Sequence, residues 1–169
     1  MIALLGVLLG GWLSLRNQDR LWQRDHARQW RDIRLAAYKD FVVATRAYVT
    51  YAAEPSVGVT AVPHPRVPDT LMPVFDTAGR PYVERLDAAS TTVRLVSESP
   101  QTIRATGAVV GSARQIAAAR AAHADPELPV ENFVALWSAL QAFLTAARQE
   151  LGLVETPEGA YNVHEPTVE

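Results

Sequence analysis

The sequence predicts an all-α fold in which an N-terminal transmembrane helix continues into an antiparallel four-helix bundle. Three observations lead to this fold class. The chain opens with an apolar run without a charge, at residues 2–15, and four later stretches repeat apolar residues every three or four positions. Prolines fall between these stretches or in their first turns. With 169 residues, 49% of them hydrophobic, the chain is long enough to form one domain with a core.

Residues 1–15 are interpreted as a transmembrane anchor. At about 1.5 Å per residue they span only about 22 Å, less than the roughly 30 Å hydrocarbon core of a bilayer. Local thinning of the bilayer, arginine side chains that reach back to the headgroups, or an upstream start codon would each close this gap. A cleaved signal peptide is the rival interpretation, but its basic residues would precede the apolar run, whereas here they follow it.

The position of the arginines also predicts an orientation. Lys and Arg are retained on the cytoplasmic side of a membrane, and here they come directly after the apolar run. We therefore expect a single-pass protein of the cell membrane, with a short N-terminus outside and a cytoplasmic C-terminal domain.

Residues 16–53 predict one long juxtamembrane helix, the first helix of the bundle. Two series of residues recur every three or four positions, and no Pro or Gly interrupts them. The basic series is Arg16, Arg20, Arg24, Arg28, Arg31 and Arg34, and the apolar series is Trp22, His26, Trp30, Ile33, Ala37, Phe41, Ala44, Tyr48 and Tyr51. The apolar series is expected to enter the core, while the basic series is either a solvated surface or a contact with lipid.

Two pairs of residues near the N-terminus are candidate contacts with the membrane or with a second copy. In an upright helix only Arg16 and Arg20 lie close enough to bind lipid headgroups, because the attraction fades within about 8 Å at physiological salt. Gly6 and Gly10 form a small-xxx-small pair that would let two anchors approach each other, which allows a homodimer; a lipid-facing position is the alternative.

Residues 54–80 are rich in proline and are expected to be a plain connection. The stretch contains Pro55, Pro63, Pro65, Pro68 and Pro73. A loop of this length is uncommon in a compact bundle and is usually functional or disordered. Extended polyproline geometry, which a partner domain could bind, is the alternative interpretation.

Residues 81–152 are predicted to hold the other three helices. Pro73 or Pro81 suits the first turn of the second helix. Ser99 can cap the third helix, with Pro100 in its first turn, and a left-handed cap at Gly152 would end the fourth. The apolar positions with helical spacing are Tyr82, Leu86, Ala89, Val93 and Val96 in the second helix, Ile103, Gly107, Val110, Ala113, Ala117 and Ala121 in the third, and Phe133, Leu136, Trp137, Leu140, Phe143, Leu144, Ala147 and Leu151 in the fourth.

Two further expectations concern the third helix and the end of the chain. Gly107 and Gly111 repeat the small-xxx-small pattern, and we expect them to allow close packing in the core. Residues 153–169 contain several Glu and no basic residue, so they are predicted to form a disordered acidic tail.

The sequence offers no motif that carries chemistry. It has no cysteine, and no two of its four histidines lie at the spacing of a helical metal site. Glu84 and Asp87 could form a carboxylate pair, but Arg80 and Arg85 surround them, which favours a salt-bridged surface. Phosphate-binding and acyl-transfer motifs are absent. We therefore expect neither an enzyme nor a cofactor, and because the only basic stretch lies beside the membrane, no nucleic-acid partner.

The order of an apolar anchor, the stretch RNQDRLWQRDHARQWRDIRLAAYKDFVVATRAY, a loop and three more helices resembles uncharacterised small single-pass membrane-anchored helical proteins of actinobacteria and their phages. The resemblance implies a fold and a location. The first functional hypothesis is a membrane-anchored cytoplasmic helical-bundle interaction or scaffold protein, whose partners are membrane lipid and an unknown protein. The alternatives are an extracytoplasmic ligand-sensing bundle, and a phage-encoded membrane effector that acts on the host envelope or excludes other phages.

Overall fold

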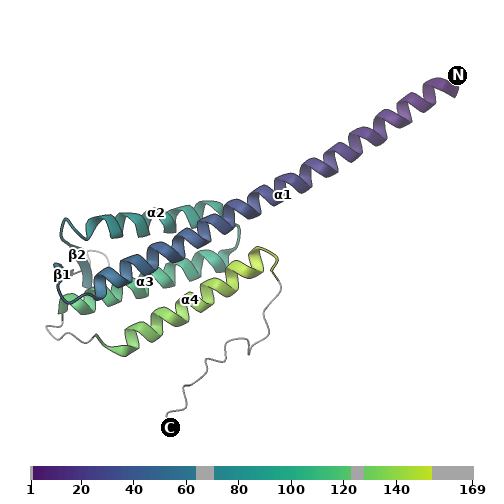
Figure 1. The fold of residues 1–169 in the computed structure, drawn as a ribbon. Coiled ribbons are helices and arrows are strands. Elements are labelled where there is room, and N and C mark those ends of the chain that lie inside the picture. Colours follow the sequence, from purple (N-terminus) through teal and green to yellow (C-terminus); the bar gives the residue numbers. More distant parts are fainter. Residues whose placement is uncertain (1, 64–70, 123–127, 154–169) are drawn as a thin grey trace, which may run out of the picture.

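The computed structural model describes residues 2–63, 71–122 and 128–153, and within the first helix it describes side chains from His26 onward. The element order is α1 (Ile2–Ala53), β1 (Val59–Pro63), β2 (Leu71–Phe75), α2 (Arg80–Val96), α3 (Pro100–Ala122) and α4 (Val130–Glu150). Successive helices run in alternating directions, and α1 extends far beyond the other three at its N-terminal end (Figure 1). The prediction of a mainly helical bundle is confirmed. The predicted acidic tail lies, from residue 154 on, outside the described residues.

The prediction of a transmembrane helix at residues 1–15 finds no support in the structure. Within the described residues, no helix combines the length and the apolar character that crossing a membrane requires. Ile2–Leu15 is helical, as part of α1. The uncharged run ends at Arg16, however, and is therefore shorter than the roughly 20 apolar residues of a membrane span.

Helix α1 is one continuous helix, as predicted, and it enters the core only in its second half. Phe41, Tyr48 and Ala52 are almost completely buried, whereas Trp30 and Ile33 are each 40% exposed. The exposed indole of Trp30 instead donates a hydrogen bond to Nε2 of His26, one turn earlier. Among the described side chains of the predicted apolar series, the core face begins at Ala37.

The connection at residues 54–80 contains an antiparallel hairpin, which the sequence did not predict. Strands β1 and β2 pair in a register that places Ala61 opposite Pro73 and Pro63 opposite Leu71. Proline normally argues against a strand because it cannot donate to the ladder. Both strands of a two-stranded hairpin are edge strands, however, and an edge position tolerates proline. The part of the Pro-rich stretch at residues 64–70 lies outside the described residues.

The hairpin packs against α3 and is fixed to α1 by aromatic contacts. The ring of Phe75 lies 5.3 Å from that of Tyr48, and Tyr51 stacks on Tyr82 of α2 at 4.4 Å. Such pairs stabilise a core beyond the apolar area that they bury. The hairpin therefore closes the end of the bundle at which α1 ends.

Helix α3 buries a face that overlaps the predicted one at Ala113 and Ala117 but is shifted around the helix. Its buried residues are Thr102, Thr106, Val109, Ala113, Ile116, Ala117 and Arg120. Gly107 and Gly111 are exposed, and a Cβ atom at either position would meet nothing within 4 Å, so the expectation that they allow close packing is wrong. The face is displaced because the core accepts threonines: the hydroxyl of Thr106 donates to the carbonyl of Thr102 at 2.8 Å.

The predicted helix ends are confirmed where the structure describes them. The hydroxyl of Ser99 accepts the backbone N–H of Thr102 at 3.3 Å, which caps α3. Gly152 has a φ of 65°, in the left-handed region, and Leu153 N–H donates to the Arg148 carbonyl at 2.9 Å. This is a Schellman ending of α4.

Two glycine-to-alanine changes should have opposite effects on stability. A Cβ atom at Gly79 would lie 2.6 Å from Cδ1 of Phe75 and 2.8 Å from Cε1 of Tyr51, so Gly79→Ala is expected to cost about 1 to 3 kcal/mol. Gly107→Ala adds a methyl group in open space on a helix and should stabilise the protein by roughly 0.5 to 1 kcal/mol. Urea unfolding of both variants measures the difference, and equal effects would contradict the packing of the hairpin onto α1.

Candidate interaction surface

The apolar face of α4 is wider than the core that it covers. Leu136 is 7% exposed and Phe143 is fully buried, as a core position requires. Val134 and Trp137, however, are 62% and 63% exposed, and Leu140 is only partly buried. The exposed large apolar residues of α4 are Val130, Phe133, Val134, Trp137 and Leu144. Large apolar side chains gathered on one exposed face are typical of a binding surface.

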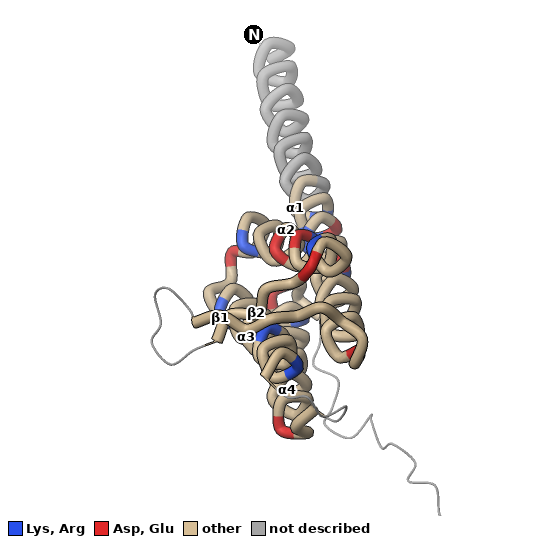
Figure 2. Tube along the Cα trace, turned by 90° about the vertical axis from the view of Figure 1, so that its left-hand side faces the viewer, with Lys and Arg blue, Asp and Glu red and all other residues tan. Residues whose placement is uncertain are grey.

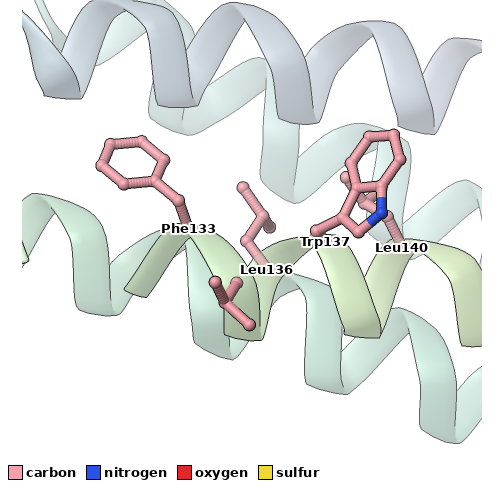
Figure 3. Close-up of a pocket in the computed structure, with 5 residues that line it drawn as sticks. Phe133, Leu136, Trp137 and Leu140 are labelled. Atoms are coloured by element: carbon pink, nitrogen blue, oxygen red, sulfur yellow. The ribbon is translucent and has the colours of Figure 1, made fainter. Parts of the chain in front are cut away.

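Five residues of this face line a shallow groove with a volume of about 390 Å³. They are Phe133, Val134, Leu136, Trp137 and Leu140. Figure 3 shows the four labelled side chains pointing from α4 in the direction of the α1 ribbon. The lining is almost entirely apolar, so the groove suits an apolar side chain of a partner and offers no group that could carry out acid–base chemistry.

The groove lies beside the place where α4 contacts α1. The ring of Phe143 lies 5.7 Å from Tyr38 and 5.0 Å from Phe41, both in edge-to-face geometry. Val42, one turn after Tyr38, packs against the core but is only partly buried. The contact between the two helices is thus centred on Phe143, and the first half of α4 keeps its apolar side chains partly open to solvent.

Charge is absent from most of α4. Residues 132–147 contain no charged side chain, and the charged residues Glu131, Arg148 and Glu150 lie at the two ends of the helix. Figure 2 shows the distribution of charge along the chain. An exposed helix surface normally carries charged residues, so this surface is chemically unlike the rest of the bundle.

The carboxylate of Glu150, at the opposite end of α4, accepts four hydrogen bonds from other described residues. Its Oε2 accepts hydrogen bonds from the hydroxyls of Tyr38 at 2.7 Å and Ser97 at 2.8 Å. Its Oε1 accepts the backbone N–H groups of Glu98 at 2.8 Å and Ser99 at 3.3 Å. We call these residues, together with Arg34, the polar clamp.

Arg34 completes the polar clamp from α1. Its Nε donates to the Val96 carbonyl at 2.9 Å and lies 3.8 Å from Oε1 of Glu150, and its guanidinium also bonds Glu98. The side chains of Arg34 and Glu150 are 15% and 6% exposed, so water screens their attraction little. The clamp therefore joins α1, the turn between α2 and α3, and the end of α4.

The environment of the clamp shifts the pKa values of two of its members. Burial alone would raise the pKa of Glu150, but the hydrogen bonds from Tyr38, Ser97 and the Glu98 backbone outweigh burial and hold it below its ordinary value of 4.5. Burial raises the pKa of Tyr38 to about 12, and its bond to the Glu150 carboxylate acts in the same direction. Both groups keep their neutral-pH protonation states, as a structural network requires.

An ion pair between α2 and α3 accounts for one member of the candidate carboxylate pair on α2. Asp87 pairs with Arg114 of α3 at 2.8 Å, and both side chains are about half exposed, at 49% and 48%. Glu84 is exposed. The pair is thus part of a solvated surface between α2 and α3, as the sequence indicated.

The residues singled out in the sequence lie elsewhere in the fold. Gly6, Gly10, Arg16 and Arg20 all belong to α1, but in its first part, where the structure describes no side chains. Their roles as lipid or self-association contacts therefore stay predictions. The α4 surface could have been found in the sequence, because its predicted apolar stripe of eight residues is broader than one core contact needs.

The polar clamp had no such signal in the sequence, because its members come from three separate stretches. Arg34 and Tyr38 belong to α1, residues 97–99 to the turn before α3, and Glu150 to the end of α4. No family model, curated protein or solved structure matches the chain.

Proposed function

We propose that the chain is a membrane-bound interaction module, a helical bundle that binds a protein partner through the exposed apolar surface of α4. One observation carries the proposal: the uncharged stretch 132–147, in which Trp137 is 63% exposed over an apolar groove. Aromatic residues at the centre of an uncharged apolar patch are the usual anchors of protein interfaces.

A binding role is favoured over a catalytic one by the way the bundle uses its polar groups. The Glu150 carboxylate is occupied by four hydrogen-bond donors of the chain itself. Arg120 of α3 donates to the Ala53 carbonyl at 2.9 Å, at the end of α1. These polar groups therefore make hydrogen bonds within the fold. The apolar groove is the surface that we propose for a partner.

The proposal places the bundle at the cytoplasmic side of a membrane, held there by the first part of α1. Two features support membrane association: the uncharged run Ile2–Leu15, and the arginines, starting with Arg16 and Arg20, that follow it on the same helix. Since the run is shorter than a membrane span, insertion needs local thinning of the bilayer or arginine side chains that reach back to the headgroups.

Flotation with lipid vesicles tests the membrane part of the proposal. The full chain is expected to float with vesicles that contain anionic lipid, whereas a variant with Leu5→Asp and Leu9→Asp should stay in the soluble fraction, because charge is costly in hydrocarbon. A matched control with Leu35→Asp changes an exposed leucine on the same helix and should still float. Flotation of the double variant would contradict anchoring by the apolar run.

Photocrosslinking in the native cell tests the docking surface. A photoreactive residue at Val134 should give an adduct of defined mass, because this position is 62% exposed beside the groove. The control position is Leu95 on α2, which is 79% exposed and outside the surface. Adducts of the same masses from both positions, or none from Val134, would contradict the proposed function.

A further inference from the structure

A second apolar seam runs along α4, separate from the one that enters the core. Its members follow each other at spacings of four, three, four and three residues, and they are Val130, Val134, Trp137, Gln141 and Leu144. This is the heptad spacing of a helix that pairs with another helix. The core residues Leu136 and Phe143 each precede a seam residue by one position, or about 100° around the helix.

Every member of the seam is exposed, so the described residues of one chain leave it uncovered. Val130 is 70% exposed, and Leu144, at the other end of the seam, is 41% exposed. The exposed area of the four apolar members together with Phe133 is on the order of 500 Å². Two such surfaces would bury about 1,000 Å², which is the lower limit for a specific interface.

The chemistry of the seam suits an identical helix. No charged residue occurs at 132–147, so two copies can approach without like-charge repulsion. Gln141 is the one polar member, and a single polar residue in a heptad seam fixes the register of two identical helices, because its amide can hydrogen-bond its counterpart. The seam, apolar except for one amide, is therefore complementary to the same seam on a second copy.

We infer that a second copy of this chain occupies the α4 surface, with the two α4 helices side by side in the same direction. The inference rests on the proposed membrane-bound docking function, and it names the partner. Within one copy α4 runs opposite to α1 (Figure 1). Parallel α4 helices therefore place both α1 N-termini at the same end of the dimer, where one membrane can hold both, whereas an antiparallel pair would point them in opposite directions.

The spacing along α1 agrees with this arrangement. The 36 residues between Gly6 and Val42 are ten whole turns at about 3.6 residues per turn, which places Gly6 on the same side of α1 as Val42. That side includes Tyr38, one turn before Val42, which contacts Phe143 of α4. Gly6 and Gly10 thus lie on the side of α1 from which a second copy would approach.

Single-cysteine variants test the parallel pairing directly, because the chain has no cysteine of its own. In a parallel dimer each seam residue lies opposite its counterpart, so Val134→Cys and Leu144→Cys should each form an intermolecular disulfide under mild oxidation of the full chain in vesicles. The control is Leu95→Cys, which is more exposed than either seam position but lies outside the seam. Disulfide formation at the two seam positions should be at least tenfold faster than at the control.

The orientation can be read from the same experiment. In an antiparallel pair centred on Trp137, the two copies of residue 144 would lie about 21 Å apart, far beyond the reach of a disulfide. A disulfide between Val130→Cys and Leu144→Cys, with none formed by Leu144→Cys alone, would overturn the parallel arrangement. Disulfide formation at none of the positions would overturn the dimer.

A change at the centre of the seam tests the dimer without a covalent bond. Trp137→Glu places a charge in the interface and should weaken association of the full chain in detergent at least tenfold, as measured by sedimentation. Val43→Glu on α1 is the matched control, because Val43 is also exposed, at 43%, and should leave association unchanged. Equal association of the two variants, with unaltered helix content by circular dichroism, would overturn the inference.

Failure of the dimer and failure of the docking function give different results. If the crosslinker at Val134 gives an adduct with a different protein, the docking function stands and the second copy is ruled out as the occupant. If it gives no adduct and the cysteine variants give no disulfide, both fail. An adduct of twice the mass of the chain supports both.

Discussion

Phe143→Ala is expected to lower the free energy of unfolding by about 3 to 5 kcal/mol, because it removes a large side chain from the centre of the core. Phe143 is fully buried, and its ring packs edge-to-face against Tyr38 and Phe41. Alanine would leave a cavity at the only close aromatic contact between α1 and α4 among the described residues. Urea unfolding followed by circular dichroism measures the loss.

Phe133→Ala is the matched control for that change. It makes the same substitution ten positions earlier on α4, at a side chain that is 37% exposed. Because less apolar area is removed from the core, the cost should be about 1 kcal/mol or less. Equal costs at the two positions would mean that α4 buries its whole apolar face, which would remove the basis for a free docking surface.

Loss of the Glu150 carboxylate should have the second largest effect. Glu150→Ala removes an acceptor from the Tyr38 and Ser97 hydroxyls and from two backbone N–H groups, and it removes one anionic neighbour of Arg34, at a site where the Glu150 side chain is 6% exposed. Breaking a buried charged network in this way costs about 3 kcal/mol. Glu98→Ala is the control: the Glu98 side chain is 82% exposed, so the cost should be below about 1 kcal/mol.

The same carboxylate should make stability depend on acid pH. The pKa of Glu150 is lower in the folded protein than its ordinary value of 4.5, so the unfolded chain takes up the proton first as the pH falls. The stabilisation is complete above about pH 4.5 and is lost as the pH falls through the lowered pKa. The wild-type protein should therefore lose more stability between pH 5 and pH 3 than Glu150→Gln does; an identical pH dependence would exclude this role of the carboxylate.

The sequence predicted the features of the fold that depend on local rules. Helical spacing located all four helices, and the caps at Ser99 and Gly152 are set by residues within three positions of the helix ends. The hairpin was not predicted because its prolines argue against strands. Proline is tolerated here because both strands are edge strands. Local chemistry does not reveal which strands have a second neighbour.

Features that depend on packing between distant segments could not be predicted in the same way. The buried face of α3 is shifted from the predicted one because Thr102 and Thr106 are core residues, and the Thr106 hydroxyl bonds to the Thr102 carbonyl one turn earlier. The α4 stripe was predicted, but the sequence does not say that the bundle covers only half of it. The hydrogen bond between Tyr38 and Glu150 joins residues 112 positions apart, and no sequence pattern near either residue predicts it.

The place of the polar clamp gives α1 a mechanical role. Arg34 contacts the end of α2 and the end of α4, and α1 extends beyond the other helices (Figure 1). At about 1.5 Å per residue, α1 continues for about 48 Å from Arg34 to Ile2. A rotation of this projecting part of α1 by about 5° about Arg34 displaces Ile2 by about 4 Å. The bonds of the Arg34 guanidinium and the Tyr38 hydroxyl resist this movement. Force applied at the end of this projecting part is thus delivered to the turn before α3 and to the end of α4, the helix that carries the exposed seam.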